Sequence, residues 1–278
     1  MAEAVVERTL YRTGALRLGE FRCPPESPRW RRPNETPGRA HVAFPGTSAI
    51  IRHAGAEPVL ANANHAVFYN PGQRYRRALH DPRGDRCWFL ELAPALASEL
   101  GEFRFAAGPA DARARLLLHV AVRHLEGGRP DPLLVEETLL EALARTVEAA
   151  ARFHRRSDPQ SPAHRQLVER AKELLTETAC ERLPLAELGC RLHVSEFHLA
   201  RVFRAGTGVG LHRYRTHLRL RLALERLAGP DVDLARLARD LGFASHSHFT
   251  DSFRAVFGVP PSAVRGRVPR ATVRLLLQ

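Results

Sequence analysis

The sequence predicts an α+β multidomain protein with an N-terminal β-barrel, a helical linker and an all-α C-terminal domain. Three observations predict this fold class. Short apolar stretches broken by Gly, Pro, Asn and Asp fill roughly the first 95 residues. Apolar residues at helical spacing begin at about residue 111. The last third holds two similar segments, each with the form of two helices joined by a tight turn.

The first predicted domain, residues 1–105, contains the apolar stretches HVAFP, SAIIRHAG, HAVFYNPG and RCWFLEL. Each is as short as an ordinary strand and is bounded by residues that favour turns. Closely spaced short strands favour a barrel or a sandwich over a fold in which strands and helices alternate. An aromatic and polar pocket in this domain would draw on side chains such as Tyr69, Arg74, Tyr75 and Trp88.

The second predicted region, residues 106–160, contains two helices. The first covers about 111–126 and begins at Asp111, and the second covers about 132–155, with Asp131 as its N-cap and Pro132 at its first position. The second helix has an apolar stripe that is suited to a partner helix, made of Leu133, Leu140, Ala144 and Val147. The segment SDPQSPA, residues 157–163, is predicted to be a linker.

The third predicted domain, residues 161–268, contains an internal repeat. LAELGCRLHVSEFHLARVFRAGTGVGLHRYR begins at Leu185, and LARLARDLGFASHSHFTDSFRAVFGVPPSAVR begins at Leu234. Matching positions include Ser195 with Ser245 and Arg215 with Arg265. Each copy predicts a short apolar helix, a tight turn, a serine that caps a second helix, and that helix, which is the form of a helix-turn-helix unit.

The second helix of such a unit enters the major groove of DNA, and its early exposed positions meet base edges. Leu199, Val202 and Phe203 are predicted to pack inward in the first copy, as are Phe249 and Phe253 in the second. The opposite faces supply hydrogen-bonding groups, an arginine that can fork onto guanine, and apolar groups for thymine methyls. The candidate DNA contacts are Ser195, Glu196, Phe197, Ala200, Arg201, Arg204, Ser245, His246, Ser247, His248, Thr250, Asp251 and Arg254.

At these residues the sequence resembles the AraC/XylS family of bacterial transcription regulators, over about 165–265. VSEFHLARVFRAGTG resembles the first reading helix of the family, and RLRLALERLAG resembles the helix that joins its two subdomains. The second copy matches the family signature of GF, S-x-S-x-F, F, FG, P and R. The resemblance implies two helix-turn-helix units, joined by a helix over about 211–227, that read major-groove segments roughly one turn or 34 Å apart. The sequence departs from the family pattern at Ala200, Asp251 and Val264.

The resemblance also implies a role for the first half of the chain. Residues 1–105 would be a cupin-like sensor domain, and residues 106–160 a dimerisation or linker region. The expected partners are double-stranded DNA, a small-molecule effector, a second copy of the chain in a homodimer, and RNA polymerase. We expect no cofactor, no catalytic residue and no metal site. His41, His53, His65 and His80 occur in the first half, but the H-x-H and Glu pattern of metal-binding cupins does not.

The charge of the chain agrees with a polyanionic partner. The net charge is +12, and residues 162–278 contain 19 Lys and Arg against 11 Asp and Glu. A GC-rich genome would produce the same excess of arginine without any functional meaning. No apolar run of about 18 residues occurs, so we expect no membrane span. The first residues lack an apolar signal core and the four cysteines have no CxxC spacing, so we expect a cytoplasmic protein with reduced thiols.

Three alternatives to a regulator follow from the sequence. The cluster SHSH around His246 and His248 resembles a metal site, but residues two apart do not share a helix face, which favours the DNA-facing interpretation. A metal-dependent cupin enzyme fused to a DNA-targeting module would contain stoichiometric metal. An architectural DNA binder without sequence preference would lose its affinity steeply as salt rises, and would have no preferred site.

Overall fold

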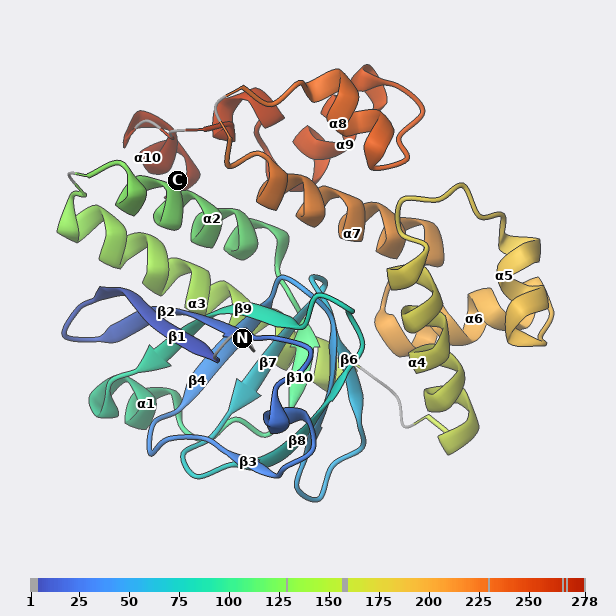
Figure 1. The fold of residues 1–278 in the computed structure, drawn as a ribbon, viewed down its shortest axis with the longest axis horizontal. Coiled ribbons are helices and arrows are strands. Elements are labelled where there is room, and N and C mark those ends of the chain that lie inside the picture. Colours follow the sequence, from blue (N-terminus) through green and yellow to red (C-terminus); the bar gives the residue numbers. More distant parts are fainter. Residues whose placement is uncertain are drawn as a thin grey trace. The chain divides into compact units, whose positions relative to one another are not determined.

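The computed structural model describes residues 5–128, 130–156, 160–229, 231–266, 268 and 270–277 (Figure 1). The chain forms two compact units. The N-terminal unit runs to Ala151 and also includes the helix nearest the C-terminus, α10 (Arg270–Leu277). The C-terminal unit is Arg152–Val268.

The strands of the N-terminal unit form two antiparallel sheets among the described residues. One sheet has the order β1 (Val6–Arg12), β2 (Leu16–Cys23), β9 (Asp85–Leu92), β4 (His41–Pro45), β7 (His65–Tyr69) and β10 (Ala107–Pro109). The other has the order β3 (Asn34–Glu35), β8 (Arg74–Leu79), β5 (Ala49–His53) and β6 (Val59–Ala61). A short 3₁₀ helix, η1 (Pro28–Trp30), lies between β2 and β3.

The two sheets share one core. Side chains alternate along each strand, so one face of each strand is apolar. The six-stranded sheet contributes Phe21, Val67 and Phe89, and the four-stranded sheet contributes Ala49 and Ile51. The prediction of a β-rich N-terminal domain is confirmed, but the pairing of its described strands gives two sheets and not one closed barrel.

The helices of the N-terminal unit are α1 (Pro94–Leu100), α2 (Ala112–Glu126), most of α3 (Pro132–Arg156), and α10. Asp111 caps α2 by accepting a hydrogen bond from the backbone N–H of Ala114 at 2.9 Å. Arg113 of α2 donates to the carbonyl of Leu276 in α10, which ties the two helices together. The predicted helices at about 111–126 and 132–155 are confirmed, whereas α1 was not predicted.

Helix α3 has two apolar stripes. The stripe that packs into the unit includes Leu134, Val135, Leu139 and Leu143, which are at most 5% exposed. The predicted stripe for a partner helix is a different one, and its first residue, Leu133, is 74% exposed. The partner-helix role of that stripe stays a prediction.

The C-terminal unit is helical. Its elements are α4 (Pro162–Glu177), α5 (Leu185–Leu192), α6 (Glu196–Thr207), α7 (Leu211–Arg226), α8 (Leu234–Asp240), α9 (His246–Phe257) and the short η2 (Pro261–Val264). The predicted joining helix over about 211–227 is confirmed as α7.

The predicted linker 157–163 is wrong at its end. Ser161 accepts a hydrogen bond from the N–H of His164, and α4 begins at Pro162, because serine followed by proline is a favoured helix start. Residues 157–159 lie outside the described part of the chain. No helix in the described part is long and apolar enough to cross a membrane. All four cysteines are free thiols.

Candidate nucleic-acid interface and candidate effector cavity

Helices α5 and α6 form the first helix-turn-helix. The turn between them is tight, because His193 adopts the left-handed conformation at φ 57° and a Cβ on Gly189 would lie 2.8 Å from the carbonyl oxygen of Val194. Ser195 then caps α6 by accepting a hydrogen bond from the N–H of His198 at 3.3 Å. The turn and the cap set the direction in which α6 leaves α5.

Helices α8 and α9 repeat this arrangement. Asp233 caps α8 by accepting hydrogen bonds from the N–H groups of Ala235 and Arg236. Ser245 caps α9 by accepting a hydrogen bond from the N–H of His248 at 3.1 Å. The prediction of two serine-capped second helices is therefore confirmed in both copies.

The second helix of each unit, α6 or α9, ends at a glycine. Gly208 after α6 and Gly258 after α9 have φ values of 74° and 81°, the left-handed region that favours glycine. The segment GTGVG, residues 206–210, is thus a helix end and a turn.

In each helix-turn-helix, an arginine that follows the second helix donates a hydrogen bond to a backbone carbonyl just before the first helix. Arg215 donates from Nη1 to the carbonyl of Leu183 at 2.8 Å, just before α5 begins. Arg265 donates from Nη1 to the carbonyl of Val232 at 3.2 Å, just before α8 begins. Arg215 and Arg265 occupy matching positions of the sequence repeat, and this match is the sequence feature from which the shared contact could have been predicted.

The inner faces of the two reading helices pack as predicted. Leu199, Val202 and Phe203 of α6 are at most 2% exposed, and Phe249 and Phe253 of α9 are fully buried. Each burial holds the helix in a fixed rotation about its own axis. The packing of these buried side chains therefore determines which residues of each helix face outward.

The outer face of α6 carries one exposed aromatic ring and two arginines. Phe197 in the first turn is 90% exposed, which is unusual for a large apolar side chain. Arg201 and Arg204 are exposed, and neither forms an ion pair with a described residue. The Arg201 guanidinium lies 3.4 Å from Nδ1 of His198. Of the other candidates, Ser195 and Glu196 are exposed and Ala200 is half-buried.

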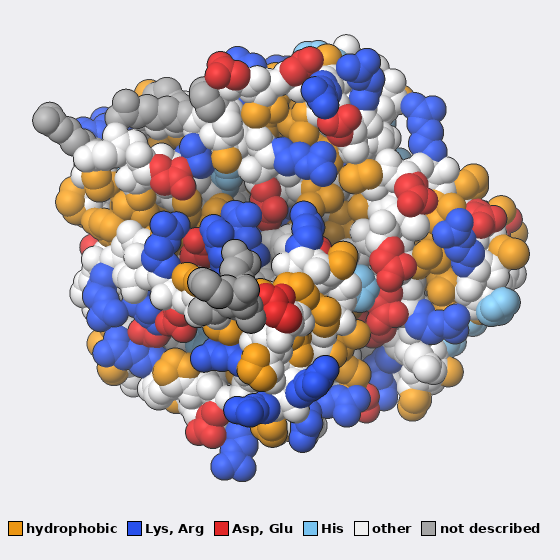
Figure 2. All heavy atoms as spheres, viewed as in Figure 1, with side chains coloured by type: hydrophobic (Ala, Val, Ile, Leu, Met, Phe, Trp, Pro, Cys, Tyr) orange, Lys and Arg blue, Asp and Glu red, His pale blue; other side chains and the backbone are white. Residues whose placement is uncertain are grey.

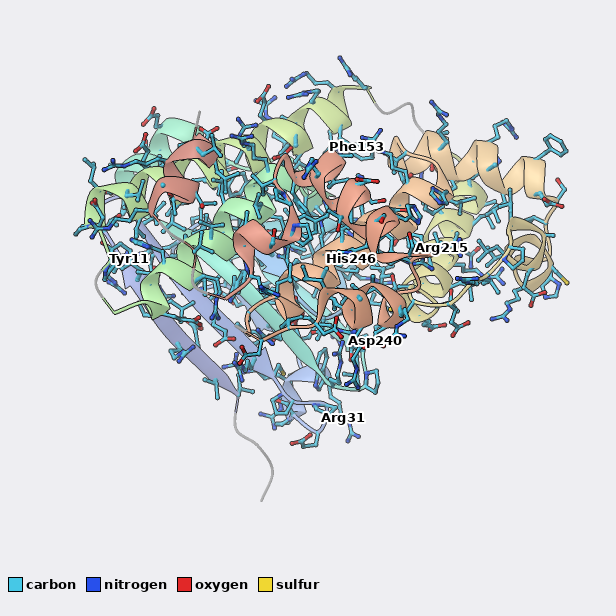
Figure 3. All side chains as sticks on the ribbon, turned by 90° about the horizontal axis from the view of Figure 1, so that it is seen from above. Tyr11, Arg31, Phe153, Arg215, Asp240 and His246 are labelled. Carbon is cyan, nitrogen blue, oxygen red and sulfur yellow. The ribbon has the colours of Figure 1, made fainter. Side chains whose placement is uncertain are left out.

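The outer face of α9 is polar. His246, labelled at the start of α9 in Figure 3, lies with Nε2 3.5 Å from the Thr250 hydroxyl. Thr250 is half-buried, and the remaining candidates are exposed: Ser245, His246, Ser247, His248, Asp251 and Arg254. Both outer faces bring the predicted residues together, and their contacts with DNA stay a prediction.

The two histidines of α9 have different neighbours. His246 lies against Thr250, whereas the ring of His248 packs against the ring of Phe243, with centroids 5.5 Å apart. Within the described parts of the chain, no group of three or more His, Cys, Asp or Glu side chains is placed to hold a metal ion.

Arginine side chains are spread over the face seen in Figure 2, with acidic side chains among them.

The N-terminal unit contains a cavity of about 110 Å³ between its sheets. Its walls are partly aromatic, from Phe21, Tyr69, Tyr75 and Phe89. Gly19 makes room for this wall, because a Cβ there would lie 2.2 Å from the ring of Phe89. A cavity of roughly 150 Å³ is known to hold benzene, so this smaller one would hold at most a molecule of about one ring.

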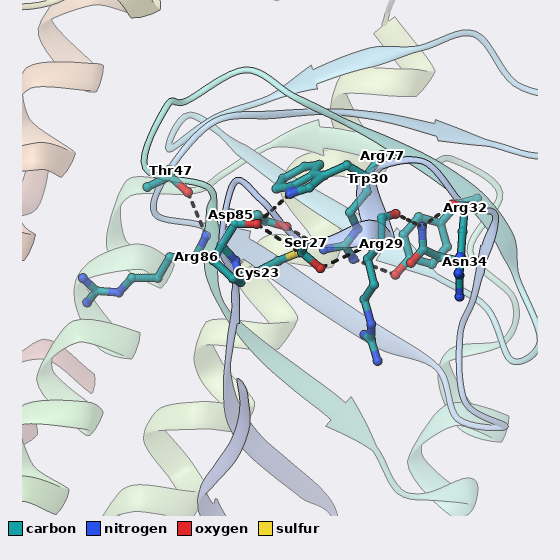
Figure 4. Close-up of polar contacts among 12 residues, drawn as sticks. Cys23, Ser27, Arg29, Trp30, Arg32, Asn34, Thr47, Arg77, Asp85 and Arg86 are labelled. Atoms are coloured by element: carbon teal, nitrogen blue, oxygen red, sulfur yellow. Dashed lines mark hydrogen bonds and ion pairs between the residues drawn. The ribbon is translucent and has the colours of Figure 1, made fainter. Parts of the chain in front are cut away.

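Two buried ion pairs line the cavity. Arg77 forms an ion pair with Asp85, with Nη1 3.0 Å from Oδ2. Both side chains are labelled in the close-up of Figure 4, and Arg77 also donates to the hydroxyl of Tyr75. Arg17 and Glu91 are 2.6 Å apart. Burial raises the pKa of Asp85, and the neighbouring Arg77 opposes that rise. The charges within each pair compensate each other. Arg17 also pairs with Glu7 at 2.9 Å, and Glu91 lies 3.6 Å from Arg39.

Histidines near the cavity are neutral. Burial lowers the pKa of His53 to about 4, and its ring packs against Tyr69 and Tyr75. Burial also lowers the pKa of His41 to about 4, and its ring stacks on Tyr69 with centroids 4.6 Å apart.

The predicted pocket residues divide into two pairs. Tyr69 and Tyr75 line the cavity. Arg74 does not, since its side chain is 78% exposed and lies 3.5 Å from Glu35. Trp88 faces elsewhere and contacts His119 of α2, with ring centroids 6.5 Å apart. Strand alternation explains the difference, because neighbouring residues such as Arg74 and Tyr75 point to opposite faces.

Comparison with known proteins finds similarity in the helical C-terminal part. Residues 188–267 match the family described as a helix-turn-helix domain. The regulatory protein PocR of Salmonella typhimurium is 26% identical over 105 residues, which are 38% of this chain and 35% of PocR. A Streptomyces lividans protein described as an AraC-like transcription regulator is 35% identical over 81 residues, which are 29% of this chain and 27% of that protein.

Among solved structures, a transcriptional regulator with an AraC-type DNA-binding domain from Chromobacterium violaceum is 24% identical. The match covers 38% of this chain and 94% of that chain, with a TM-score of 0.35. The matched part of this chain spans about a third of the length of the two curated relatives.

Proposed function

We propose that this chain is a transcription regulator of the AraC family, which its similarity over residues 188–267 supports, and that it binds specific sites in double-stranded DNA through α6 and α9. The observation that carries the proposal is the repeated unit itself. Each copy has a serine-capped second helix, a buried apolar back and an exposed outer face. The two outer faces would read two short boxes roughly one helical turn apart.

The two reading helices would contribute differently. Helix α6 offers Arg201 for the O6 and N7 atoms of guanine, and Phe197 for a thymine methyl. Helix α9 offers His246, Ser247 and Thr250 for hydrogen bonds to bases or phosphates. Asp251 can accept a hydrogen bond from cytosine N4, and it repels phosphate wherever no cytosine faces it.

The division of labour along the chain is part of the proposal. Residues 1–105 form the sensor domain, for which the family resemblance implies a cupin-like fold. Residues 106–160 form the dimerisation or linker region. Residues 161–268 bind DNA. The stripe of α3 that begins at the exposed Leu133 would contact a second copy in a homodimer. RNA polymerase would be contacted from the DNA-bound form. The proposal assigns the chain no catalytic residue and no cofactor.

The effector would occupy the cavity of the N-terminal unit. Aromatic walls and compensated ion pairs suit a small, planar molecule without net charge. Such a ligand acts on DNA binding only if it binds one conformation of the protein more tightly than another. Binding of benzyl alcohol compared with benzylamine, and of benzamide compared with benzoate, tests the charge preference of the cavity, because the members of each pair differ in charge and hardly in size.

The DNA-binding proposal is tested by selecting duplexes from a random pool with the full-length protein at a salt concentration of about 150 mM. A regulator should enrich a two-box motif and prefer it to unrelated duplexes by about 10³-fold or more. Binding without enrichment that disappears as salt rises would contradict the proposal, and would favour a sequence-indifferent architectural protein.

A further inference from the structure

Arg219 connects the two helix-turn-helix units. Arg219 lies in the middle of α7 and is 8% exposed. Its guanidinium donates from Nε to the carbonyl of Ala179 at 2.6 Å and from Nη2 to the carbonyl of Glu181 at 2.7 Å. Both acceptors lie between α4 and α5, in the segment that leads into the first helix-turn-helix. Its Nη1 donates to the carbonyl of Gly242 at 2.8 Å, in the turn between α8 and α9.

These contacts form a rigid junction. Arg219 has no carboxylate partner among the described residues, so three backbone carbonyls replace the water that its charge has lost. Burial lowers the pKa of Arg219, and the charge of Arg215 lowers it further. A guanidinium donates in fixed directions within one plane, so the three carbonyls are held in one mutual arrangement.

The backbones of the two units also approach each other closely at this point. Gly242 has a φ of 75°, and a Cβ there would lie 2.3 Å from the carbonyl oxygen of Cys180 and 2.9 Å from Nη2 of Arg219. Glycine is therefore required both by the backbone conformation and by the space. The turn of the second unit thus rests directly on the segment that leads into the first.

Two other arginines with similar contacts act within one helix-turn-helix unit. Arg215 contacts Leu183 in the first unit, and Arg265 contacts Val232 in the second. Arg219 differs because its acceptors come from both. Arg215 lies one turn before Arg219 on α7, which makes it a matched control.

We propose that Arg219 is a positioning residue that fixes the orientation of α9 relative to α6, and so determines which distance between two DNA boxes the protein accepts. This inference rests on the proposed function. One base pair inserted between the boxes moves the second box by about 3.4 Å and rotates it by roughly a tenth of a turn. A rigid junction would not tolerate that change, whereas a loosened one would.

The first test measures the affinity of the full-length protein for two-box duplexes in which the distance between boxes varies by single base pairs. Wild type and Arg215→Met should show one sharp optimum. Arg219→Met should lose about tenfold at that optimum and bind the neighbouring spacings almost equally well, while single-box affinity stays within about twofold. Arg219→Lys, which keeps the charge but not the planar fork, should fall between them. An equal loss at every spacing would overturn the inference.

The second test does not depend on DNA. Spin labels attached through ketone-bearing residues at Ala205 and Ala255, exposed equivalent positions of α6 and α9, report the distance between the two helices. Wild type should give a narrow distance distribution and Arg219→Met a broad one. Arg219→Lys serves if the methionine variant fails to fold. An unchanged distribution would overturn the inference. If wild type selects no DNA motif but the distribution broadens as expected, the proposed function fails and the positioning role stands.

Discussion

Phe197→Ala separates the reading face of α6 from its packing face. Because the Phe197 ring is 90% exposed, its removal should change the free energy of unfolding by less than about 0.5 kcal/mol. Phe203 is the matched control, since its ring is on the same helix and fully buried. Phe203→Ala should cost about 3–5 kcal/mol of stability.

The same substitution should weaken DNA binding. A ring pressed against a thymine methyl removes apolar surface of both partners from water. Full burial of a phenylalanine side chain contributes about 1.5–3 kcal/mol and a methyl about 0.8 kcal/mol, so a partial contact is worth about 1–2 kcal/mol. That free energy corresponds to roughly a fivefold to thirtyfold loss of affinity.

The assay combines urea denaturation of both variants with titration of the selected duplex. Each thymine of the first box is also replaced by deoxyuridine, which removes only the methyl group. One replacement should weaken wild type and leave Phe197→Ala unaffected. The reasoning is refuted if Phe197→Ala destabilises the fold by more than about 1 kcal/mol. It is also refuted if no deoxyuridine position distinguishes the two proteins.

Three further predictions concern other side chains. Arg201→Ala should cost about 1–3 kcal/mol at one base position and relax specificity there, as a binding series over single-base variants would measure; equal losses on all duplexes would make it a phosphate contact. Asp251→Arg should raise affinity for random duplexes in a fluorescence titration, and unchanged affinity would mean that Asp251 faces away from DNA. The pKa of His53 falls from 6.5 to about 4 on folding. The free energy of unfolding should therefore be unaffected by this group above pH 6.5, and should decrease by roughly 3 kcal/mol as the pH falls towards 4, because the unfolded chain then binds the proton more tightly. His53→Gln should flatten that decrease in denaturation curves, and an equally steep curve would exclude His53 as its cause.

Local sequence signals predicted the C-terminal unit well. The serine caps at Ser195 and Ser245 and the buried Phe203, Phe249 and Phe253 depend on spacing within one helix, which the sequence displays directly. Helix α7 was predicted from the family resemblance.

Contacts between distant residues could not be predicted in this way. Arg219 donates hydrogen bonds to Ala179, 40 residues earlier, and to Gly242, 23 residues later. The local sequence around these residues contains no pattern that predicts the contacts. The cavity likewise joins Arg17 of β2 with Glu91 of β9, 74 residues apart, because the order of strands in the sheet does not follow the chain. Helix α3 shows a further limit, since both of its apolar stripes have helical spacing and only packing selects the buried one.

The central claim is that α6 and α9 read two neighbouring major-groove segments on one face of DNA. Hydroxyl-radical footprinting of the full-length protein on its selected duplex tests it most directly. We predict two protected segments whose centres lie about 10 base pairs apart, with the Phe197→Ala effect confined to one of them. A single protected segment, or uniform protection along the duplex, would contradict the account.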